Sequence, residues 1–395
     1  MYGMPQGWII FVLLHGLGIT IVAAALGYAW TTLLASSRRL RGFRPDPAHA
    51  RGPQPVTVLK PLRGADAHLY DNLRSFCVQA YENYQLVLGV RDAEDPAIEV
   101  MQRLRAEFPQ LDMALVVNPS THGSNPKVSN LINMLPAARY DWLVLADSDI
   151  RVPPDYLARV TTPLAAPGTG IVTCLYRGIV ERGFWSWLGR MFIDDWFVPS
   201  VRLACAFSPP RFAFGSTIAL RRDVLRAIGG FEVLRDALAD DYWLGELVRR
   251  SGFHIVVSDL LVGTQVSETR LASLWTRELR WLRTVRAIAP WGFSMTWVCF
   301  TCPAAALGLA LAPTAWTSGL ATLAIAARLL LHIMQARAER AQLPWYEIFL
   351  VPLRDTVLLL QWATALTGWQ VHWHGRSLDA RAGHSAATLI RHSTT

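Results

Sequence analysis

Two aspartates separated by one residue follow a strand-like apolar run near the middle of the chain. Asp147 and Asp149 come directly after residues 142–146. In an extended chain, residues i and i+2 point the same way, so both carboxylates could converge on one hard cation at the carboxyl end of a buried strand. Mg²⁺ or Mn²⁺, held by one or two carboxylates and completed by substrate phosphates, fits such a pair. The simpler alternative is a polar strand end that introduces a helix at Pro153.

The segments that would position this pair alternate between strand and helix. Strands are expected at residues 56–59, 84–90, 113–117, 142–146, 170–176 and 215–220, and helices at 66–80, 94–108, 127–138, 222–228 and 240–250. Such alternation argues for an α/β fold with a mostly parallel sheet covered by helices. The run of residues 53–290 is long enough for one such domain with its own core.

The beginning of the chain has the composition of a membrane anchor. Residues 8–34 form a nearly uncharged apolar run, and about 20 helical residues span ~30 Å of hydrocarbon. The residues before this run lack the basic charge of a signal peptide, so an uncleaved transmembrane anchor is expected over residues 1–36. A basic and proline-rich linker follows at residues 37–54, with Arg38, Arg39, Arg41 and Arg44. By the positive-inside rule, the domain after this linker lies in the cytoplasm.

An amphipathic segment and further apolar stretches make up the carboxyl-terminal part. Within residues 270–290, an arginine recurs at every third position from Arg277 to Arg286 with Trp and Leu between, which is typical of a helix lying in a membrane interface. Residues 291–370 contain three apolar stretches, at 293–312, 314–331 and 343–367, before a tail at 371–395. Arg354 and Asp355 interrupt the third stretch, and intramembrane charges are costly. Three full spans would also put the basic tail outside, so the third stretch is expected to be re-entrant or interfacial.

The charge of the chain narrows the class of partner. The formal net charge is +8, and only two of the 38 basic residues are lysines, Lys60 and Lys127. This arginine bias fits a GC-rich genome, so the overall charge carries little functional weight. A basic surface suits anionic lipid headgroups, so the membrane is the expected partner. The sequence contains no nucleic-acid-binding motif, and no nucleic acid partner is expected.

Candidate site residues occur in a defined order along the chain. They are Asp92, the pair Asp147 and Asp149, Asp241 at a helix start, and the segment Arg277-Glu278-Leu279-Arg280-Trp281. This order resembles the inverting, metal-dependent glycosyltransferases with the GT-A fold. Residues 58–64, 125–131, 145–150 and 238–242 look like the ceramide glucosyltransferase family, and within it they most resemble the bacterial hopanoid-biosynthesis-associated glycosyltransferases. The resemblance implies a Rossmann-like, mixed-sheet GT-A catalytic domain over residues 55–269, flanked by transmembrane helices.

The resemblance also implies a donor site. Asp92 and Lys127 would help to hold the nucleotide of a UDP-sugar. Asp149, with Asp147, would hold the Mg²⁺ or Mn²⁺ that neutralises the leaving diphosphate as a Lewis acid. These four residues are therefore the expected donor-binding and metal-binding set.

An acceptor site is implied in the same way. Asp241 would deprotonate the acceptor hydroxyl on the face opposite the leaving group, which gives inversion. Asp240 is the alternative, and Asp241 is preferred because the family's acidic pair uses its second member. Arg277, Arg280 and Trp281 would lie near the diphosphate and the acceptor entrance.

A membrane-bound enzyme that moves N-acetylglucosamine or glucose from a UDP-sugar to a lipid hydroxyl is therefore expected. It would be a multi-pass protein of the bacterial inner membrane with a cytoplasmic catalytic domain. The resemblance puts a hopanoid such as bacteriohopanetetrol first as acceptor, with ceramide as the alternative. A processive polysaccharide synthase is less favoured, because few spans remain for a polymer channel and Arg277 stands where those enzymes usually carry Gln. A non-enzymatic scaffold is disfavoured because all the expected carboxylates are present.

Overall fold

The chain divides into two compact units. The computed structural model describes residues 6–37, 54–180, 182–338, 346–373 and 376–383 of 395. The expected linker arginines, at positions 38–44, and most of the expected tail lie outside these residues. Of the described residues, the α/β unit comprises 54–179, 208–266 and 382–383, and the helical unit comprises 6–37, 180–207 and 267–381. Residues 180–207, expected within the catalytic domain, thus belong to the helical unit.

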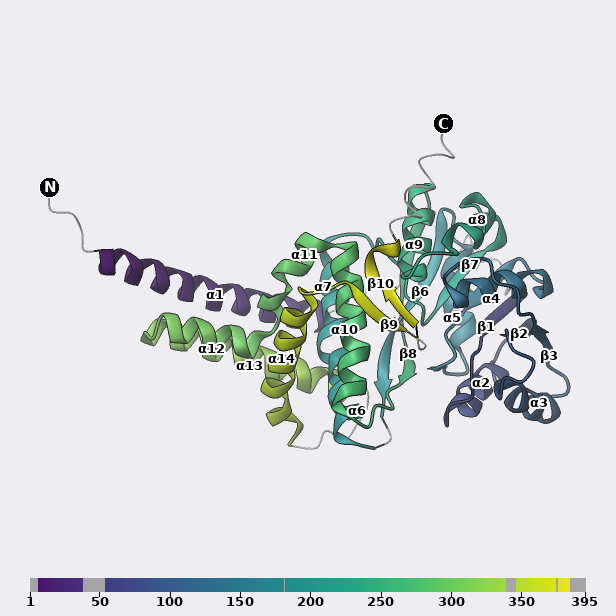
Figure 1. The fold of residues 1–395 in the computed structure, drawn as a ribbon, viewed down its shortest axis with the longest axis horizontal. Coiled ribbons are helices and arrows are strands. Elements are labelled where there is room, and N and C mark those ends of the chain that lie inside the picture. Colours follow the sequence, from purple (N-terminus) through teal and green to yellow (C-terminus); the bar gives the residue numbers. More distant parts are fainter. Residues whose placement is uncertain (1–5, 38–53, 181, 339–345, 374–375, 384–395) are drawn as a thin grey trace. The chain divides into compact units, whose positions relative to one another are not determined.

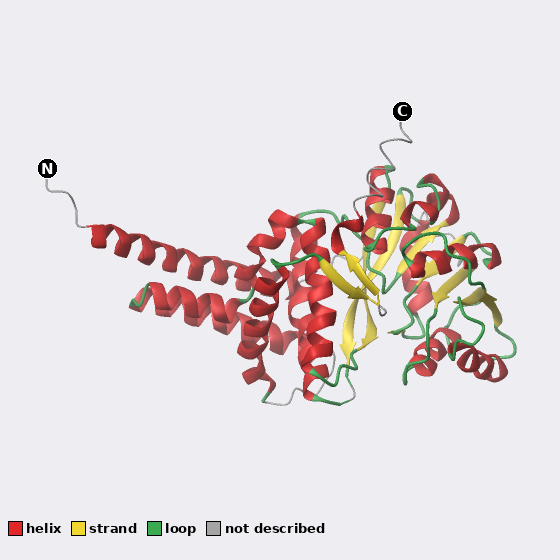
Figure 2. Cartoon of the chain, in the orientation of Figure 1, coloured by secondary structure: helices red, strands yellow, loops and turns green. Residues whose placement is uncertain are grey.

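A mixed eight-stranded sheet forms the centre of the α/β unit, in the order β3-β2-β1-β4-β7-β6-β8-β5 (Figures 1 and 2). The strands are β1 (Val56–Pro61), β2 (Tyr84–Val90), β3 (Asp112–Val117), β4 (Trp142–Leu145), β5 (Ile150–Arg151), β6 (Thr169–Ile179), β7 (Ile218–Arg221) and β8 (His254–Gln265). The first four strands run parallel, as the alternation of strand and helix predicts. β7 runs antiparallel to β4 and β6, whereas β8 runs parallel to β6 and antiparallel to β5.

The helices of this unit cover the sheet and bury its parallel strands. They are α2 (Leu69–Cys77), α3 (Ala97–Glu107), α4 (Pro126–Met134), α5 (Tyr156–Thr161), α8 (Arg222–Ala227) and α9 (Asp240–Arg250). β1 and β2 are buried along almost their whole length, which explains why both are continuous apolar runs. Because β1, β2 and β4 are parallel, their carboxyl ends meet at one edge of the sheet, the usual ligand edge of such folds.

The helical unit contains long apolar helices and one short hairpin. Its elements are α1 (Gln6–Ser37), α6 (Phe184–Phe192), a π-helical turn (Ile193–Phe197), α7 (Val198–Phe207), α10 (Leu271–Ile288), α11 (Pro290–Met295), α12 (Thr301–Leu311), α13 (Ala315–Ala338), α14 (Glu347–Ala365), β9 (Gln370–Trp373) and β10 (Arg376–Asp379). α1 packs on α12 and α13 through small residues (Figure 1). A Cβ added at Gly18 of α1 would lie 2.7 Å from the carbonyl oxygen of Gly308 of α12. Small residues allow this close approach of two helices in lipid.

Three described helices are long and apolar enough to cross a membrane: residues Gly7–Ser37, Ala315–Arg337 and Glu347–Ala365. The segments Pro290–Cys299 and Thr301–Leu311 together pass the same test but are bent by 75°, so there are up to four spans if this pair is one. The expected re-entrant or interfacial stretch was the last one. The described part of that stretch forms one helix, α14, so it is not re-entrant, and the sharp bend lies in the first carboxyl-terminal stretch. An interfacial location of α14 stays a prediction.

The two charges inside α14 are each paired with a charge on another helix. Arg354 donates a hydrogen bond to Glu278 of α10 over 2.7 Å, and both side chains are fully buried. Asp355 accepts a hydrogen bond from Arg328 of α13 over 2.9 Å. Pairing of this kind is what lets ionisable groups persist between apolar helices. These charges are therefore contacts between helices.

Two of the regularly spaced arginines of α10 form hydrogen bonds within the helical unit. Arg283 donates to the carbonyl oxygens of Thr367 and Gln370 over 3.1 and 2.5 Å. Arg286 donates to the carbonyl oxygens of Ala365 and, over 2.7 Å, of Gly368. The last carbonyls of a helix lack intrahelical partners, so Arg286 completes the end of α14 at Ala365. The other three carbonyls lie just after the helix. The expected location of α10 in a membrane interface stays a prediction.

Candidate active site

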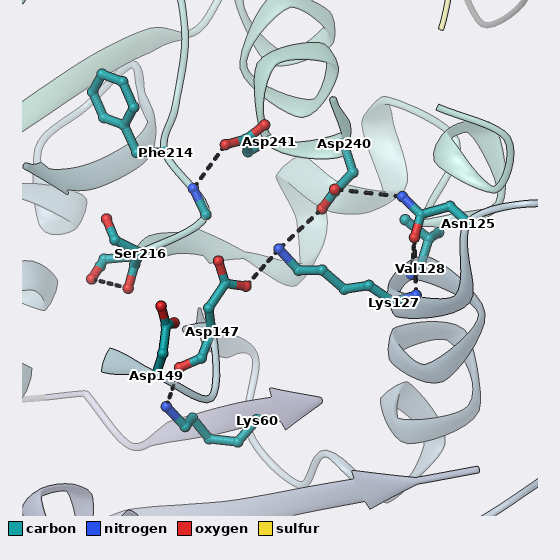
Figure 3. A network of polar contacts seen from close by, with 12 residues as sticks. Lys60, Asn125, Lys127, Val128, Asp147, Asp149, Phe214, Ser216, Asp240 and Asp241 are labelled. Atoms are coloured by element: carbon teal, nitrogen blue, oxygen red, sulfur yellow. Dashed lines mark hydrogen bonds and ion pairs between the residues drawn. The ribbon is translucent and has the colours of Figure 1, made fainter. Parts of the chain in front are cut away.

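Asp147 lies in the loop between β4 and β5, and its side chain points toward Lys127 (Figure 3). The distance from Lys127 Nζ to Asp147 Oδ1 is 2.7 Å. The main chain of Asp147 is fixed separately, because its N–H donates to the carbonyl of Gly215 and its own carbonyl accepts from Lys60. The structure therefore places the Asp147 carboxylate at the carboxyl end of β4, as the sequence predicts.

Lys60, at the end of β1, is fully buried beneath this loop. Its Nζ donates to the Asp147 carbonyl oxygen over 2.5 Å and lies 4.0 Å from the centre of the Phe76 ring. Burial lowers the pKa of Lys60 to about 7, although the nearby carboxylates of Asp149 and Asp147 oppose that shift. A buried lysine held against a main-chain carbonyl fixes the path of the Asp147–Asp149 loop.

Asp149 is held from the other side by β8. Its Oδ2 accepts a hydrogen bond from the Thr264 hydroxyl over 2.8 Å, and its carbonyl accepts from the Gln265 N–H. Burial, together with the negative charge of Asp147, raises the pKa of Asp149 above its usual range. A cation bound by the two carboxylates would offset both the burial of the Asp149 charge and its repulsion from Asp147.

The donor set of this loop fits Mg²⁺ or Mn²⁺. Asp147 and Asp149 supply hard carboxylate oxygens, the ligands that these ions prefer. Among the residues that the structure describes, no group of three or more His, Cys, Asp or Glu side chains could hold a metal ion. The loop would thus contribute two carboxylates, and other oxygens, such as those of a diphosphate, would complete the coordination.

Lys127 joins the two acidic parts of the site (Figure 3). It stands in the first turn of α4, which begins at Pro126 and is capped by the Asn125 side chain, the acceptor for the N–H groups of Lys127 and Val128. Lys127 Nζ lies 3.3 Å from Asp240 Oδ2 in addition to its contact with Asp147. Burial opposes its charge, but the neighbouring carboxylates together raise the pKa of Lys127 above its usual value. It therefore carries a firmly held positive charge.

Asp240 and Asp241, at the start of α9, contact different groups. Asp240 contacts Lys127 and accepts a long, 3.5 Å hydrogen bond from the Asn125 side chain. Asp241 accepts from two main-chain N–H groups, those of Gly215 over 3.0 Å and Tyr242 over 2.8 Å. Burial, together with the charge of Asp240, raises the pKa of Asp241 to about 6. A carboxylate with such a pKa is suited to accept a proton near neutral pH.

Gly215 links the two halves of the site through its main chain. Its carbonyl accepts from the Asp147 N–H and its N–H donates to Asp241. A Cβ at this position would lie 2.8 Å from Asp147 Oδ2 and 3.2 Å from Lys127 Nζ. A side chain at position 215 would displace the Asp147 carboxylate or the Lys127 ammonium group, so glycine leaves room for their ion pair.

Asp92 follows β2 at the same edge of the sheet. Its side chain is exposed, and one carboxylate oxygen accepts the N–H of Glu94 over 3.0 Å. This contact shapes the turn after β2 and leaves the rest of the carboxylate accessible. Its part in nucleotide binding stays a prediction.

The arginine and tryptophan motif belongs to α10 in the helical unit. Arg277 Nη1 lies 2.5 Å from Glu268 Oε1, and its guanidinium lies 5.2 Å from the Trp281 ring centre. The Nε and Nη2 atoms of Arg277 are buried and have no hydrogen-bond partner among the described residues. The roles of Arg277, Arg280 and Trp281 toward a diphosphate or an acceptor stay predictions.

Three residues of the site were not expected from the sequence: Lys60, Gly215 and Thr264. One signal pointed to Lys60, because it and Lys127 are the only lysines of the chain and both lie in this site. Thr264 lies on β8, a strand that the sequence analysis did not assign. Gly215 acts through its main chain, which residue type alone does not reveal.

Comparisons with known proteins show the family to which the chain is similar. The family model described as glycosyl transferase family 21 matches residues 17–386. Ceramide glucosyltransferase 1 of Caenorhabditis elegans is 27% identical over 236 residues, which cover 60% of this chain and 50% of that protein. Ceramide glucosyltransferase 3 of the same organism is 26% identical over 238 residues, covering 60% and 51%. The chain thus spans about half the length of these curated relatives.

A solved structure confirms the expected class of fold. The mannosyltransferase PcManGT from Pyrobaculum calidifontis, in complex with GDP-Man and Mn²⁺, matches with a TM-score of 0.53. The sequences are 21% identical, and the match covers 88% of this chain and 99% of the other. The α/β unit is therefore a GT-A-like mixed sheet, accompanied by long apolar helices.

Proposed function

Because the chain belongs to glycosyl transferase family 21, we propose that this glycosyltransferase moves a sugar from a UDP-sugar to a hydroxyl group of a membrane lipid. One observation carries the proposal. Asp147, which contacts Lys127 at one sheet edge, is joined through Gly215 to Asp241, a carboxylate with a pKa of about 6. A charge-neutralising group and a proton acceptor are the two components that an inverting transfer needs.

The donor side would neutralise the departing diphosphate. Asp149 and Asp147 would hold Mg²⁺ or Mn²⁺, which supplies Lewis-acid chemistry when bound. Lys127 would bind phosphate oxygens directly, since its ammonium group lies 2.7 Å from the Asp147 carboxylate. Asp92 follows β2, which β1 separates from β4, and it would bind the nucleoside part. Lys60 would hold the loop in place from below.

The acceptor side would remove one proton. Asp241 would accept the proton of the lipid hydroxyl as that oxygen forms a bond to the anomeric carbon. The bond from the anomeric carbon to the diphosphate oxygen would break on the opposite face, and its electron pair would leave with UDP. The configuration of the sugar is thereby inverted. Arg277, Arg280 and Trp281 would assist at the diphosphate and the acceptor entrance.

The acceptor would be a lipid because the chain carries membrane-length apolar helices beside its glycosyltransferase unit. The resemblance of the sequence motifs favours a hopanoid first and ceramide second. The relatives reported above are ceramide glucosyltransferases, so they favour the ceramide alternative. We therefore place a ceramide-like lipid first. The bacterial inner membrane, with the α/β unit on its cytoplasmic side, remains the proposed location.

The test uses the purified full chain in lipid nanodiscs. UDP-glucose and UDP-N-acetylglucosamine are each supplied with ceramide or with bacteriohopanetetrol, and products are identified by mass spectrometry. We expect one UDP-sugar to give a ceramide heavier by one sugar residue, and Asp241→Asn to give none. Release of UDP without any glycolipid would overturn the proposal. A product formed with bacteriohopanetetrol alone would restore the hopanoid as acceptor.

A further inference from the structure

Asn125 links the start of α4 to the segment that leads into α9, and both elements belong to the α/β unit (Figure 3). Its side chain is 3% exposed. The Oδ1 atom accepts from the N–H groups of Lys127 and Val128 and so caps α4. The Nδ2 atom donates to the main-chain carbonyl of Ala237 over 2.7 Å. A second, longer contact of 3.5 Å reaches Asp240. One side chain therefore contacts both the helix that carries Lys127 and the segment that carries the acidic residues.

Main-chain groups of the loop before α4 strengthen the same link. The Asn125 N–H donates to the carbonyl oxygen of Arg235 over 2.9 Å. The Ser124 N–H donates to a carboxylate oxygen of Asp236 over 2.8 Å. The contact of the Asn125 amide at Ala237 adds the next residue of the same segment. Two residues of the loop therefore hold three successive residues of the segment just before α9, which fixes the start of α9 against α4.

Lys127 makes a second link between α4 and α9, and this one is ionic. Its Nζ atom lies 3.3 Å from Asp240 Oδ2 and 2.7 Å from Asp147 Oδ1. In the proposed reaction the same ammonium group binds phosphate oxygens of the donor. A diphosphate carries several charged acceptor oxygens, and hydrogen bonds between charged groups are the stronger ones. Donor binding therefore draws Lys127 away from Asp240 and weakens this second link.

The amide of Asn125 is better protected from such competition. It is neutral and almost fully buried, whereas 20% of the Lys127 side chain is exposed. Its closest acceptor is a main-chain carbonyl, that of the buried residue Ala237. Leaving a buried carbonyl without a donor costs free energy, so this hydrogen bond persists unless another donor replaces it. The link through Asn125 is therefore maintained when the link through Lys127 is lost.

The position of α9 matters because this helix carries Asp241, the proposed base. Asp241 accepts from the main-chain N–H groups of Gly215 and Tyr242, so its location follows that of the main chain at the start of α9. A general base must lie within hydrogen-bond reach of the proton that it removes. A displacement of about 1 Å can cost about 100-fold in rate. The proposed reaction thus needs α9 to stay in place while the donor binds.

We propose that Asn125 is a positioning residue, whose amide holds the start of α9 in place while Lys127 exchanges Asp240 for the donor diphosphate. The inference rests on the proposed function, in which Lys127 binds phosphate and Asp241 accepts the proton. The two ends of the Asn125 side chain have separate tasks. The oxygen caps the helix that carries Lys127, and the nitrogen holds the segment that leads to the base.

Asn125→Ser separates these two tasks, because serine also caps helices well but has no nitrogen donor. Hydrogen–deuterium exchange of the main-chain amides of residues 235–243 is measured on the full chain in nanodiscs, with and without UDP and Mg²⁺. With UDP and Mg²⁺ present, we expect exchange about tenfold faster in the variant than in the wild type, the effect of one lost hydrogen bond. Without UDP, Lys127 still contacts Asp240, so the difference should be smaller.

Steady-state kinetics provide a second readout. Asn125→Ser should lower kcat at least about tenfold, while the Kd for UDP with Mg²⁺ changes less than about twofold, because the capped helix and Lys127 remain. Asn133→Ser is the matched control on the same helix. The Asn133 side chain donates to the carbonyl oxygens of Asn118 and Ser120 over 3.2 and 3.0 Å, so this variant loses bonds of the same kind elsewhere. It should leave kcat and the exchange rates of the α9 segment unchanged.

Asn125→Asp tests the nitrogen again, since it keeps the size and the capping oxygen of the side chain, and it should behave like Asn125→Ser. Unchanged exchange and unchanged kcat in both variants would overturn the proposal. So would an equally large rise in exchange without UDP, because the amide would then be a purely structural contact. Failure of the proposed function would look different, because no glycolipid would then form from any UDP-sugar. Faster exchange with UDP in a chain without transferase activity would support the link while contradicting the reaction.

Discussion

The ammonium group of Lys60 donates a hydrogen bond to the main-chain carbonyl of Asp147 over 2.5 Å, from a fully buried position. This contact joins the end of β1 to the loop that carries Asp147 and Asp149, the two carboxylates proposed to bind metal. Burying a lysine disfavours its charged form, and here it lowers the pKa of Lys60 to about 7. The fold therefore accepts a cost in stability in order to fix the position of the loop.

Lys60→Met should lower activity without lowering the free energy of unfolding. Methionine keeps the length of the side chain but cannot donate to Asp147, so we expect kcat to fall at least about tenfold, as for a lost charged hydrogen bond. The free energy of unfolding should stay equal or rise. Between pH 7 and the ordinary lysine pKa, the folded wild-type chain binds fewer protons than the unfolded chain, so the cost of burying Lys60 grows as the pH falls toward 7. The gain in the free energy of unfolding from Lys60→Met should therefore be greatest below pH 7. Parallel losses of activity and stability, by turnover assay and denaturant titration, would contradict a positioning role.

Asp241 should set the acid limit of the reaction. Its carboxylate must be ionised to accept a proton, so kcat/KM should fall about tenfold per pH unit below pH 6. Asp241→Asn should lower kcat at least about 100-fold while UDP binding is kept. Its raised pKa means that the ionised form weakens the fold as the pH rises from about 4 to about 6, so the variant should be no less stable at pH 7.

Asp240→Asn is the matched control for that experiment. Asp240 is a cause of the raised pKa of Asp241, so its removal should move the acid limb of the pH profile to lower pH. It also frees Lys127 from one partner. Activity should survive in Asp240→Asn and not in Asp241→Asn. The reverse pattern would make Asp240 the base.

Local sequence patterns predicted much of the α/β unit. The apolar run before Asp147 reads as a buried strand because β4 is covered on both sides. The Asn125-Pro126 pair reads as a helix start because the side chain caps the helix and proline suits its first turn. Both features are local, so periodicity and residue type are sufficient for them. They also put Asp147 and Lys127 where the structure has them.

Contacts between distant segments could not be predicted in this way. The antiparallel entry of β7 between β4 and β6 depends on pairing between strands far apart in the chain. In the sequence, Arg354 is an unexplained charge in an apolar stretch, because its partner Glu278 is 76 residues away. A sequence pattern records each residue's type and spacing but not its partner.

Removal of divalent metal should stop the reaction. We expect excess EDTA to abolish transfer, and added Mg²⁺ or Mn²⁺ to restore it. Asp149→Asn should need at least about tenfold more metal for half activity, since a metal-bound carboxylate is lost. Metal-dependent binding of UDP, followed by calorimetry, provides a readout without turnover. Full transfer in excess chelator would contradict the assignment of Asp147 and Asp149.

Arg354→Met should destabilise the helical unit. It leaves the fully buried carboxylate of Glu278 without its closest cation, and breaking one side of a buried ion pair costs about 3–5 kcal/mol. The measurement is thermal unfolding in detergent. Arg270→Met, at an exposed arginine just before α10, is the control and should change little. Glu278→Met combined with Arg354→Met should recover most of the loss, because two apolar side chains replace the pair. If the double variant is no more stable than Arg354→Met, the loss does not come from an unpaired carboxylate.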